Sequence, residues 1–343
     1  MPPTVIGRTV LVAAAVVLSL SMFASMLLGS HMPSGLTAFL YKAGTSWFFI
    51  LLYLLLIFLV CDLLRAVHII PKWIMYDNWK SLVTLIVFMT TLFTVGYAVY
   101  RNKKRVELTV TLDKDIPKPI KIVMASDLHL GYGIGKKELG EWVGLINSEN
   151  PDIVLFAGDV VDNNIKPLWK HGMSDSLKRI KSRYGVYMAP GNHEYISGLE
   201  NCIVFLTSSG VDVLVDSAEL VDNCFYIVGR DDMTNRGRKP LAEIMEGIDM
   251  SKPVIVLDHQ PSDLNDAAVN RADVLLCGHT HHGQVWPINW ITDAMFEKAH
   301  GYLKKDDTNI YVSSGIGLWG GKFRIGSRSE YVVINIVGKN SCL

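Results

Sequence analysis

Five apolar runs of the chain are each followed by Asp, Asn or His, residue types that are able to bind metal ions, and this pattern restricts the fold more than any other feature. The runs and the polar residues after them are Ile122 to Ala125 before Asp127 and His129, Ile153 to Ala157 before Asp159 and Asp162, Val186 to Ala189 before Asn192 and His193, Val254 to Leu257 before His259, and Val274 to Cys277 before His279 and His281. Such runs are typical of buried strands, and helical patterns lie between them. We therefore expect a layered α/β domain whose strand ends meet at one edge. Packing alone does not explain five such endings in a chain with ten histidines.

The residue types at these strand ends suit a pair of divalent metal ions. Two ions about 3.5–4 Å apart need a shared ligand, and a carboxylate with two oxygens can bridge them. We assign the bridge to Asp159. The other ligands form two sets, Asp127, His129 and His281 for one ion and Asn192, His259 and His279 for the other. On an extended segment, residues two apart point the same way, so His279 and His281 can face one site. Mixed imidazole, carboxylate and amide ligands favour Mn, Fe or Zn.

Two further residues complete a hydrolytic mechanism. A water that bridges two cations ionises near neutral pH and can attack phosphorus in line. The leaving alkoxide then needs a proton, and His193, which is not required as a ligand, is the candidate donor. Asp162 is the candidate partner that fixes the tautomer of His193. A simple helix cap is the alternative role for Asp162.

Together these stretches resemble a known family. Asp127-x-His129, Gly158-Asp159-x-x-Asp162, Gly191-Asn192-His193-Glu194, His259 and Gly278-His279-x-His281 look like the five-part signature of the calcineurin-like metallophosphoesterases. The resemblance covers about residues 120 to 337. It implies a four-layer αββα sandwich with a dimetal site at the strand ends, and it implies the same ligand roles.

The finer details of the motifs separate branches of that family. The segments 278–284, 317–320 and 324–330 resemble the membrane-anchored bacterial-type branch, in which the position of His282 usually holds a small residue. Asn163 stands where the phosphoprotein phosphatases carry an arginine. The resemblance therefore favours the membrane-anchored branch over a protein phosphatase.

The first 105 residues differ in composition from the rest. They hold 9 Lys/Arg and 2 acids, which leaves 24 basic and 31 acidic residues for 106–343, so charges of +7 and −7 cancel. The uncharged stretches 9–30, 43–61 and 81–100 are each long enough to cross ~30 Å of hydrocarbon. We expect an anchor over 1–105, with transmembrane helices at about 9–30, 43–66 and 81–100, and a catalytic domain over 106–343. A cleaved signal peptide is the alternative for the first stretch, but no cleavage site is evident. The acidic catalytic part argues against a nucleic-acid partner.

The compartment is less constrained by the sequence. Basic residues flank the expected spans equally on the two sides, but the cluster Arg101, Lys103, Lys104 and Arg105 is denser. It favours a multi-pass cell-membrane protein with a cytoplasmic catalytic domain. None of the five cysteines forms a Cys-x-x-Cys pair. A bond between Cys202 and Cys224 in an oxidising compartment stays open.

Three residues are candidates for substrate binding. Arg324 and Arg328 can clamp a phosphate, although solvated arginines at the surface are the alternative. Trp286 lies in an apolar stretch, 285–296, that follows the histidines without strand or helix periodicity. This stretch either packs on the sandwich or forms a loop at the lipid bilayer surface that admits acyl chains. We expect a membrane-bound hydrolase of a phosphate ester or pyrophosphate on a lipid-linked substrate. The alternatives are a general phosphodiesterase, a nucleotide-lipid pyrophosphatase and a catalytically silent membrane scaffold.

Overall fold

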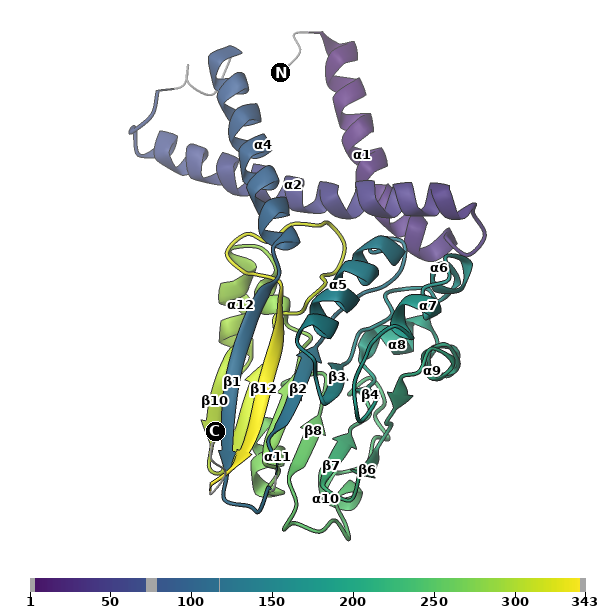
Figure 1. The fold of residues 1–343 in the computed structure, drawn as a ribbon. Coiled ribbons are helices and arrows are strands. Elements are labelled where there is room, and N and C mark those ends of the chain that lie inside the picture. The colour runs from purple at the N-terminus through teal and green to yellow at the C-terminus, as the bar shows by residue number, and fades with distance from the viewer. Residues whose placement is uncertain (1–3, 72–78, 117, 340–343) are drawn as a thin grey trace. The chain divides into compact units, whose positions relative to one another are not determined.

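The computed structural model describes residues 4–71, 79–116 and 118–339, and the chain divides into two compact units (Figure 1). The first unit comprises residues 1–98 and the short segment 320–323, and the second comprises 99–319 and 324–343. The last turn of the third long helix belongs to the second unit. The expected anchor over 1–105 and catalytic domain over 106–343 stay a prediction.

Three long helices make up most of the first unit. They are α1 (Val5–Leu28), α2 (Ser34–Ala66) and α4 (Trp79–Arg101). Each is long and apolar enough to cross a membrane. All three begin earlier than the expected spans, because single polar residues such as Arg8 and Lys42 do not interrupt a helix. Phe323 of the segment 320–323 packs edge to face with Phe49 and Phe93, with ring centroids 6.4 and 4.6 Å apart.

Two six-stranded sheets form the centre of the second unit. The first sheet has the order β1-β12-β2-β3-β4-β5 and the second β10-β11-β9-β8-β7-β6. The strands of the first sheet are β1 (Lys104–Leu112), β12 (Glu330–Gly338), β2 (Ile120–Ala125), β3 (Ile153–Ala157), β4 (Val186–Ala189) and β5 (Asp212–Val213). Those of the second are β10 (Gly301–Lys305), β11 (Thr308–Val312), β9 (Val274–Cys277), β8 (Val254–Leu257), β7 (Phe225–Gly229) and β6 (Ser217–Val221).

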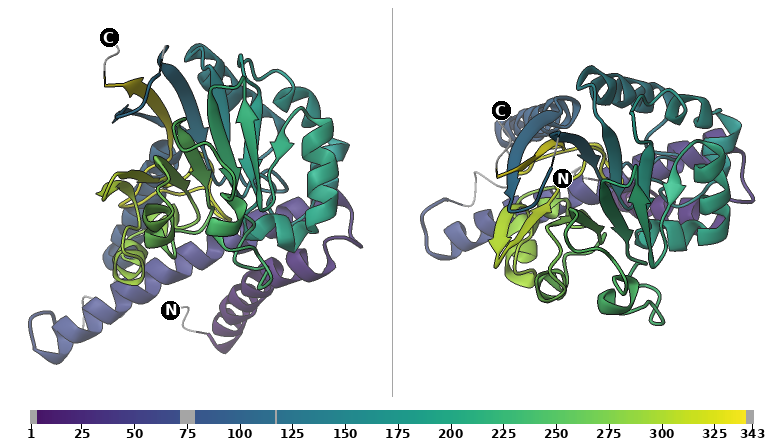
Figure 2. Two further views of the ribbon diagram at one scale, coloured as in Figure 1. Left: turned by 90° about the horizontal axis from the view of Figure 1, so that it is seen from below. Right: turned by 60° about the horizontal axis from the view of Figure 1, so that its bottom comes forward.

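Helices cover the outer faces of both sheets (Figure 2). The helices on the first sheet are α5 (Lys136–Ser148), α7 (Ser174–Leu177) and α9 (Leu199–Ser208), and those on the second are α10 (Leu241–Ile244) and α11 (Leu264–Val269). A third apolar core, which includes the fully buried Ile122, Leu155 and Leu276, lies between the sheets. The expected four-layer αββα sandwich is confirmed.

The strands that precede the candidate ligands end at one edge of the sandwich. β2, β3 and β4 are parallel, as are β7, β8 and β9. β12 runs antiparallel to β2, and β1 runs parallel to β12 with Lys104 opposite Glu330. β1 therefore starts at the edge where β2 ends. We call this edge, at which β2, β3, β4, β8 and β9 end, the ligand edge.

Several short elements lie near the ligand edge. They are α6 (Lys166–Lys170), α8 (Asn192–Ser197), the 3-10 turn η1 (His281–Gly283) and α12 (Ile288–Met295). The stretch 285–296 shows no helical period in the sequence, yet it contains α12, because eight residues are too few for a clear period. β9 ends at Cys277, and His279 has φ 70°, so the expected extended segment from 279 to 281 is wrong. Cys202 is buried, Cys224 is exposed, and both are free.

Candidate metal centre

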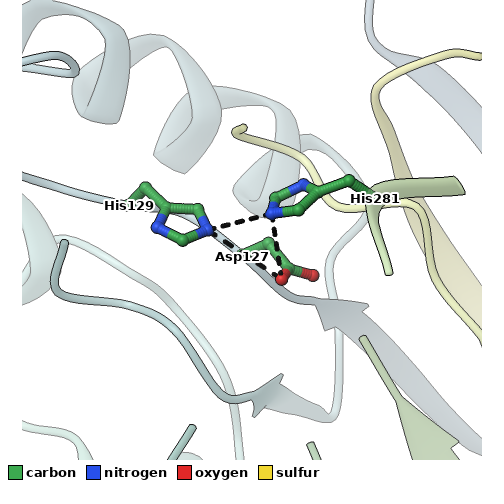
Figure 3. A group of neighbouring side chains, drawn as sticks. All are labelled: Asp127, His129 and His281. Atoms are coloured by element: carbon green, nitrogen blue, oxygen red, sulfur yellow. Dashed lines mark hydrogen bonds and ion pairs between the residues drawn. The ribbon is translucent and has the colours of Figure 1, made fainter. Parts of the chain in front are cut away.

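The first ligand cluster joins the loop after β2 to η1. Nε2 of His129 lies 3.1 Å from Nε2 of His281, which lies 3.5 Å from Oδ1 of Asp127. Figure 3 shows the two rings and the carboxylate turned toward one point. Asp127 and His129 are buried. In their unprotonated forms the two facing ring nitrogens, together with the carboxylate, offer three ligand atoms to one cation.

The second cluster lies on the other side of Asp159. Asp159, His259 and His279 bring one ligand atom each to within 4.8 Å of one another. Oδ2 of Asp159 lies 3.1 Å from Nε2 of His259 and 3.7 Å from Nε2 of His129, so this carboxylate stands between the two clusters. Oδ1 of Asn192 lies 3.0 Å from Nδ1 of His279. The structure thus brings together all seven residues that the sequence nominated as ligands.

The backbone at these ligands is unusual for non-glycine residues. Five of them have a positive φ, namely Asp127 (55°), His129 (47°), Asp159 (54°), His279 (70°) and His281 (49°). Each such conformation costs about 1–3 kcal/mol and persists only where the surroundings enforce it. Gly191 shows how tight these surroundings are, because a Cβ there would lie 2.3 Å from Oδ1 of Asp159. The fold therefore holds these loops in strained conformations that direct the ligand side chains toward one another.

The tautomer of His259 tests whether a cation fits. Its Nδ1 donates to the carbonyl oxygen of Ala157 at 2.8 Å, and a carbonyl can only accept. In the neutral ring, Nε2 is then a lone pair, and this buried atom faces Asp159 without a hydrogen-bond partner. Although burial opposes it, the Asp159 carboxylate raises the pKa of His259 well above its usual value. A field that attracts a proton to this nitrogen also attracts a metal ion.

Burial keeps the imidazoles of His279 and His281 neutral. It lowers the pKa of His279 to about 4 and that of His281 well below its usual value. A metal ligand must offer an unprotonated nitrogen, so both rings are in the binding form at pH 7. The donor set of neutral imidazoles, carboxylates and an amide oxygen therefore fits two divalent ions, and the seven residues above would hold them.

Asp162 connects the first cluster to His193. Its Oδ1 lies 3.3 Å from Nδ1 of His193 and 3.4 Å from Nδ1 of His129. Although burial works against the charged ring, the hydrogen bond to Asp162 raises the pKa of His193 to about 9. The Asp162 carboxylate therefore favours the protonated form of His193. Asp162 caps none of the described helices, and α6 begins after Ile165 instead.

Glu194 is a site residue to which the sequence gave no role. Its buried carboxylate accepts the backbone N–H groups of Asp159, Val161 and Gly191 at 3.0, 2.9 and 2.7 Å. It therefore joins the loop of the bridging Asp159 to the loop that presents Asn192. The only sign of this role in the sequence was that Glu194 directly follows Asn192 and His193.

The three candidate substrate-binding residues lie in different surroundings. Arg324 is 1% exposed, and its guanidinium donates to the carbonyl oxygens of His281 at 2.6 Å and Gly317 at 2.8 Å. The N–H groups of Arg324 therefore stabilise the backbone of these loops. Arg324 is neither the expected phosphate clamp nor the alternative, a solvated arginine at the surface. Arg328 is exposed, and Trp286 is 40% exposed. Their roles stay predictions.

An αββα sandwich with two His/Asp clusters at its ligand edge defines the metallophosphoesterase class, and comparison with known proteins agrees. The family model described as calcineurin-like phosphoesterase matches residues 120–283. An uncharacterised metallophosphoesterase of Campylobacter jejuni is 34% identical over 277 residues, which cover 77% of this chain and 73% of the relative. The chain belongs to the calcineurin-like phosphoesterase family.

A second relative bears on the apolar helices. A transmembrane protein with metallophosphoesterase domain of Danio rerio is 31% identical over 277 residues, which cover 74% of this chain and 62% of the relative. The described part of this chain likewise contains three helices that are long and apolar enough to cross a membrane. The chain is therefore that of a membrane protein.

Proposed function

We propose that the protein is a membrane-anchored hydrolase that cleaves a phosphate ester or pyrophosphate of a lipid-linked substrate with two divalent metal ions. The position of Asp159 between two ligand clusters carries this proposal, because one carboxylate reaches both. When bound, a pair of Mn, Fe or Zn ions supplies an ionised water near neutral pH and neutralises charge on the phosphoryl group. The chain's own residues do the rest.

Those residues orient the reaction and handle the proton. His193 donates a proton to the leaving oxygen, and Asp162 holds Nδ1 of His193 so that Nε2 is the donating atom. Glu194 fixes the distance between the loops of Asp159 and Asn192. The expected scaffold alternative is not favoured, because relatives without catalysis are expected to lose ligands and here all seven converge.

The lipid-linked substrate is supported by the anchor. Three apolar helices hold the catalytic unit at a bilayer, where lipids are the concentrated phosphoesters. A nucleotide-lipid pyrophosphatase and a general phosphodiesterase would use the same groups. A screen of extracted lipids and lipid-linked nucleotides with the purified protein, read by mass spectrometry, separates these substrates.

Replacement of the bridging carboxylate tests the reaction itself. We expect full-length protein with added Mn²⁺ to hydrolyse bis-p-nitrophenyl phosphate, and Asp159→Asn to lower this activity at least ~10³-fold, in line with other losses of a central electrostatic group. Asp152→Asn is the matched control, since Asp152 precedes the strand that Asp159 follows. Equal turnover by wild type and Asp159→Asn would refute the proposal.

The side of the membrane needs a separate test. The basic cluster 101–105 after α4 favours the cytoplasm for the catalytic unit. Protease added to intact cells should then spare the C-terminus, and it should cut there once the membrane is permeabilised. Cleavage in intact cells would reverse the assignment.

A further inference from the structure

α12 presents an apolar face to solvent beside the metal centre. None of its residues is buried, and Trp290, Ile291 and Met295 are 63%, 56% and 70% exposed. These positions fall on one side of a helix. Trp286 extends the face, because its ring packs edge to face on Trp290 with centroids 5.2 Å apart. Four large apolar side chains grouped on the surface mark an interaction site rather than chance exposure.

This helix is fixed to the metal-binding turn. Gly283 of η1 lies so close to the first turn of α12 that a Cβ at Gly283 would be 2.2 Å from the backbone nitrogen of Asn289. Nε2 of His282 also lies 3.6 Å from Oδ1 of Asp293. α12 therefore cannot move far without moving His281, and its apolar face belongs to the ligand edge.

The chain enters the α/β unit at that same edge. α4 ends at Arg101 and β1 begins at Lys104, so only two residues, about 7 Å of chain, separate them. Lys104 pairs with Glu330 at the end of the sheet where β2 stops. Arg101 fixes the last turn of α4 to α5 through Glu141 at 2.7 Å. The third candidate membrane span is therefore joined to the α/β unit at the ligand edge by a connection of two residues.

We infer that the apolar face of α12, defined by Trp286, Trp290, Ile291 and Met295, docks on the lipid bilayer and holds the ligand edge toward the headgroups. The inference rests on the proposed membrane-anchored function and names the surface that serves it. Two indole rings on one face suit the headgroup level, where Trp is enriched. The short connection after α4 makes the bilayer the nearest apolar phase, so it is the occupant we assign.

Label accessibility tests the docking without any need for activity. Nitroxide labels are placed at Met295→Cys and, as the matched control, at Val269→Cys in full-length protein whose labelling-competent native cysteines are replaced by Ser. Val269 is also exposed, at 69%, but it ends α11 near the opposite edge. In liposomes, we expect oxygen to accelerate the spin relaxation of the label at 295 more than a water-soluble nickel complex does. For the label at 269 we expect the nickel complex to have the larger effect. Greater nickel access at both sites overturns docking, and so does protection of 295 from both reagents, which indicates a protein partner or a second copy.

An activity measurement separates docking from the hydrolysis itself. Ile291→Ser with Met295→Ser should lower turnover of a long-chain phosphodiester in vesicles by at least ~10-fold and leave turnover of bis-p-nitrophenyl phosphate unchanged, whereas Val269→Ser should change neither. Equal loss on both substrates, or no loss on either, overturns docking and leaves the proposed function standing. If wild type hydrolyses neither substrate, the proposed function fails and the label accessibilities alone decide the docking.

Discussion

The two edges of the α/β unit use aspartate in different ways. At the edge where β3 and β9 begin, Asp152 accepts the backbone N–H of Lys121 at 2.9 Å and Asp273 that of Val254 at 2.7 Å. At the ligand edge, Asp127 and Asp159 also accept backbone N–H groups, but their carboxylates face imidazole nitrogens as well. Aspartate beside a strand thus stabilises the sheet at one edge and gathers ligands at the other. The neighbours, not the residue type, decide its role.

The backbone shows the same contrast. At the opposite edge, positive φ values occur at Asn150 and Arg271, each two residues after a helix ends, where a left-handed residue is common. At the ligand edge, positive φ values occur at the ligands themselves, such as Asp159 and His279. Strain that terminates a helix is ordinary, whereas strain that aims an ionisable side chain into a buried cluster indicates function. Substitutions at the two edges should therefore have different consequences.

The largest effect expected in that comparison concerns the proton donor of the ligand edge. His193→Asn should lower turnover of an alkyl phosphodiester by about 10²–10⁴-fold, because the alkoxide must leave with a proton. Turnover of bis-p-nitrophenyl phosphate should change little, since its leaving group departs as a stable anion. Steady-state rates on both substrates, together with bound Mn²⁺, measure this. An equal fall on both, with lost metal, would show that His193 acts as a ligand.

An intermediate effect is expected at Glu194, which joins the two ligand loops. Glu194→Gln keeps the shape but offers one oxygen and one N–H donor to three backbone N–H groups that all need acceptors. We expect metal affinity to fall about 10–100-fold, as it does when groups that orient ligands are removed. Titration of the metal-stripped protein with Mn²⁺ gives the affinity. The exposed Glu243→Gln on α10 is the control, and unchanged affinity in Glu194→Gln would remove Glu194 from the centre.

The ligand edge was more predictable from the sequence than its supports. Asp127, Asp159 and His259 follow apolar runs directly, so local pattern located both the strands and the ligands. Arg324 braces carbonyls that lie 7 and 43 residues away in sequence, and no local pattern reveals such contacts. α12 was missed because eight residues are too few to show a clear helical period, and its outward-facing apolar side could not be foreseen without the fold. Long-range contacts and unusual exposure are set by the tertiary fold.

The smallest effect is expected at the opposite edge, and it sharpens the comparison most. Asp273→Asn removes the charge that pairs with Lys114 and weakens the bond to the N–H of Val254. Because Asp273 is mostly buried, the loss should be about 1–3 kcal/mol of folding free energy, and the Tm in detergent should fall while turnover per bound metal stays constant. Thermal unfolding and kcat, measured on one preparation, check the expected fall in Tm and the expected constant turnover. A loss of kcat at unchanged Tm would mean that carboxylates at both edges serve catalysis, and the division of labour between the edges would then be wrong.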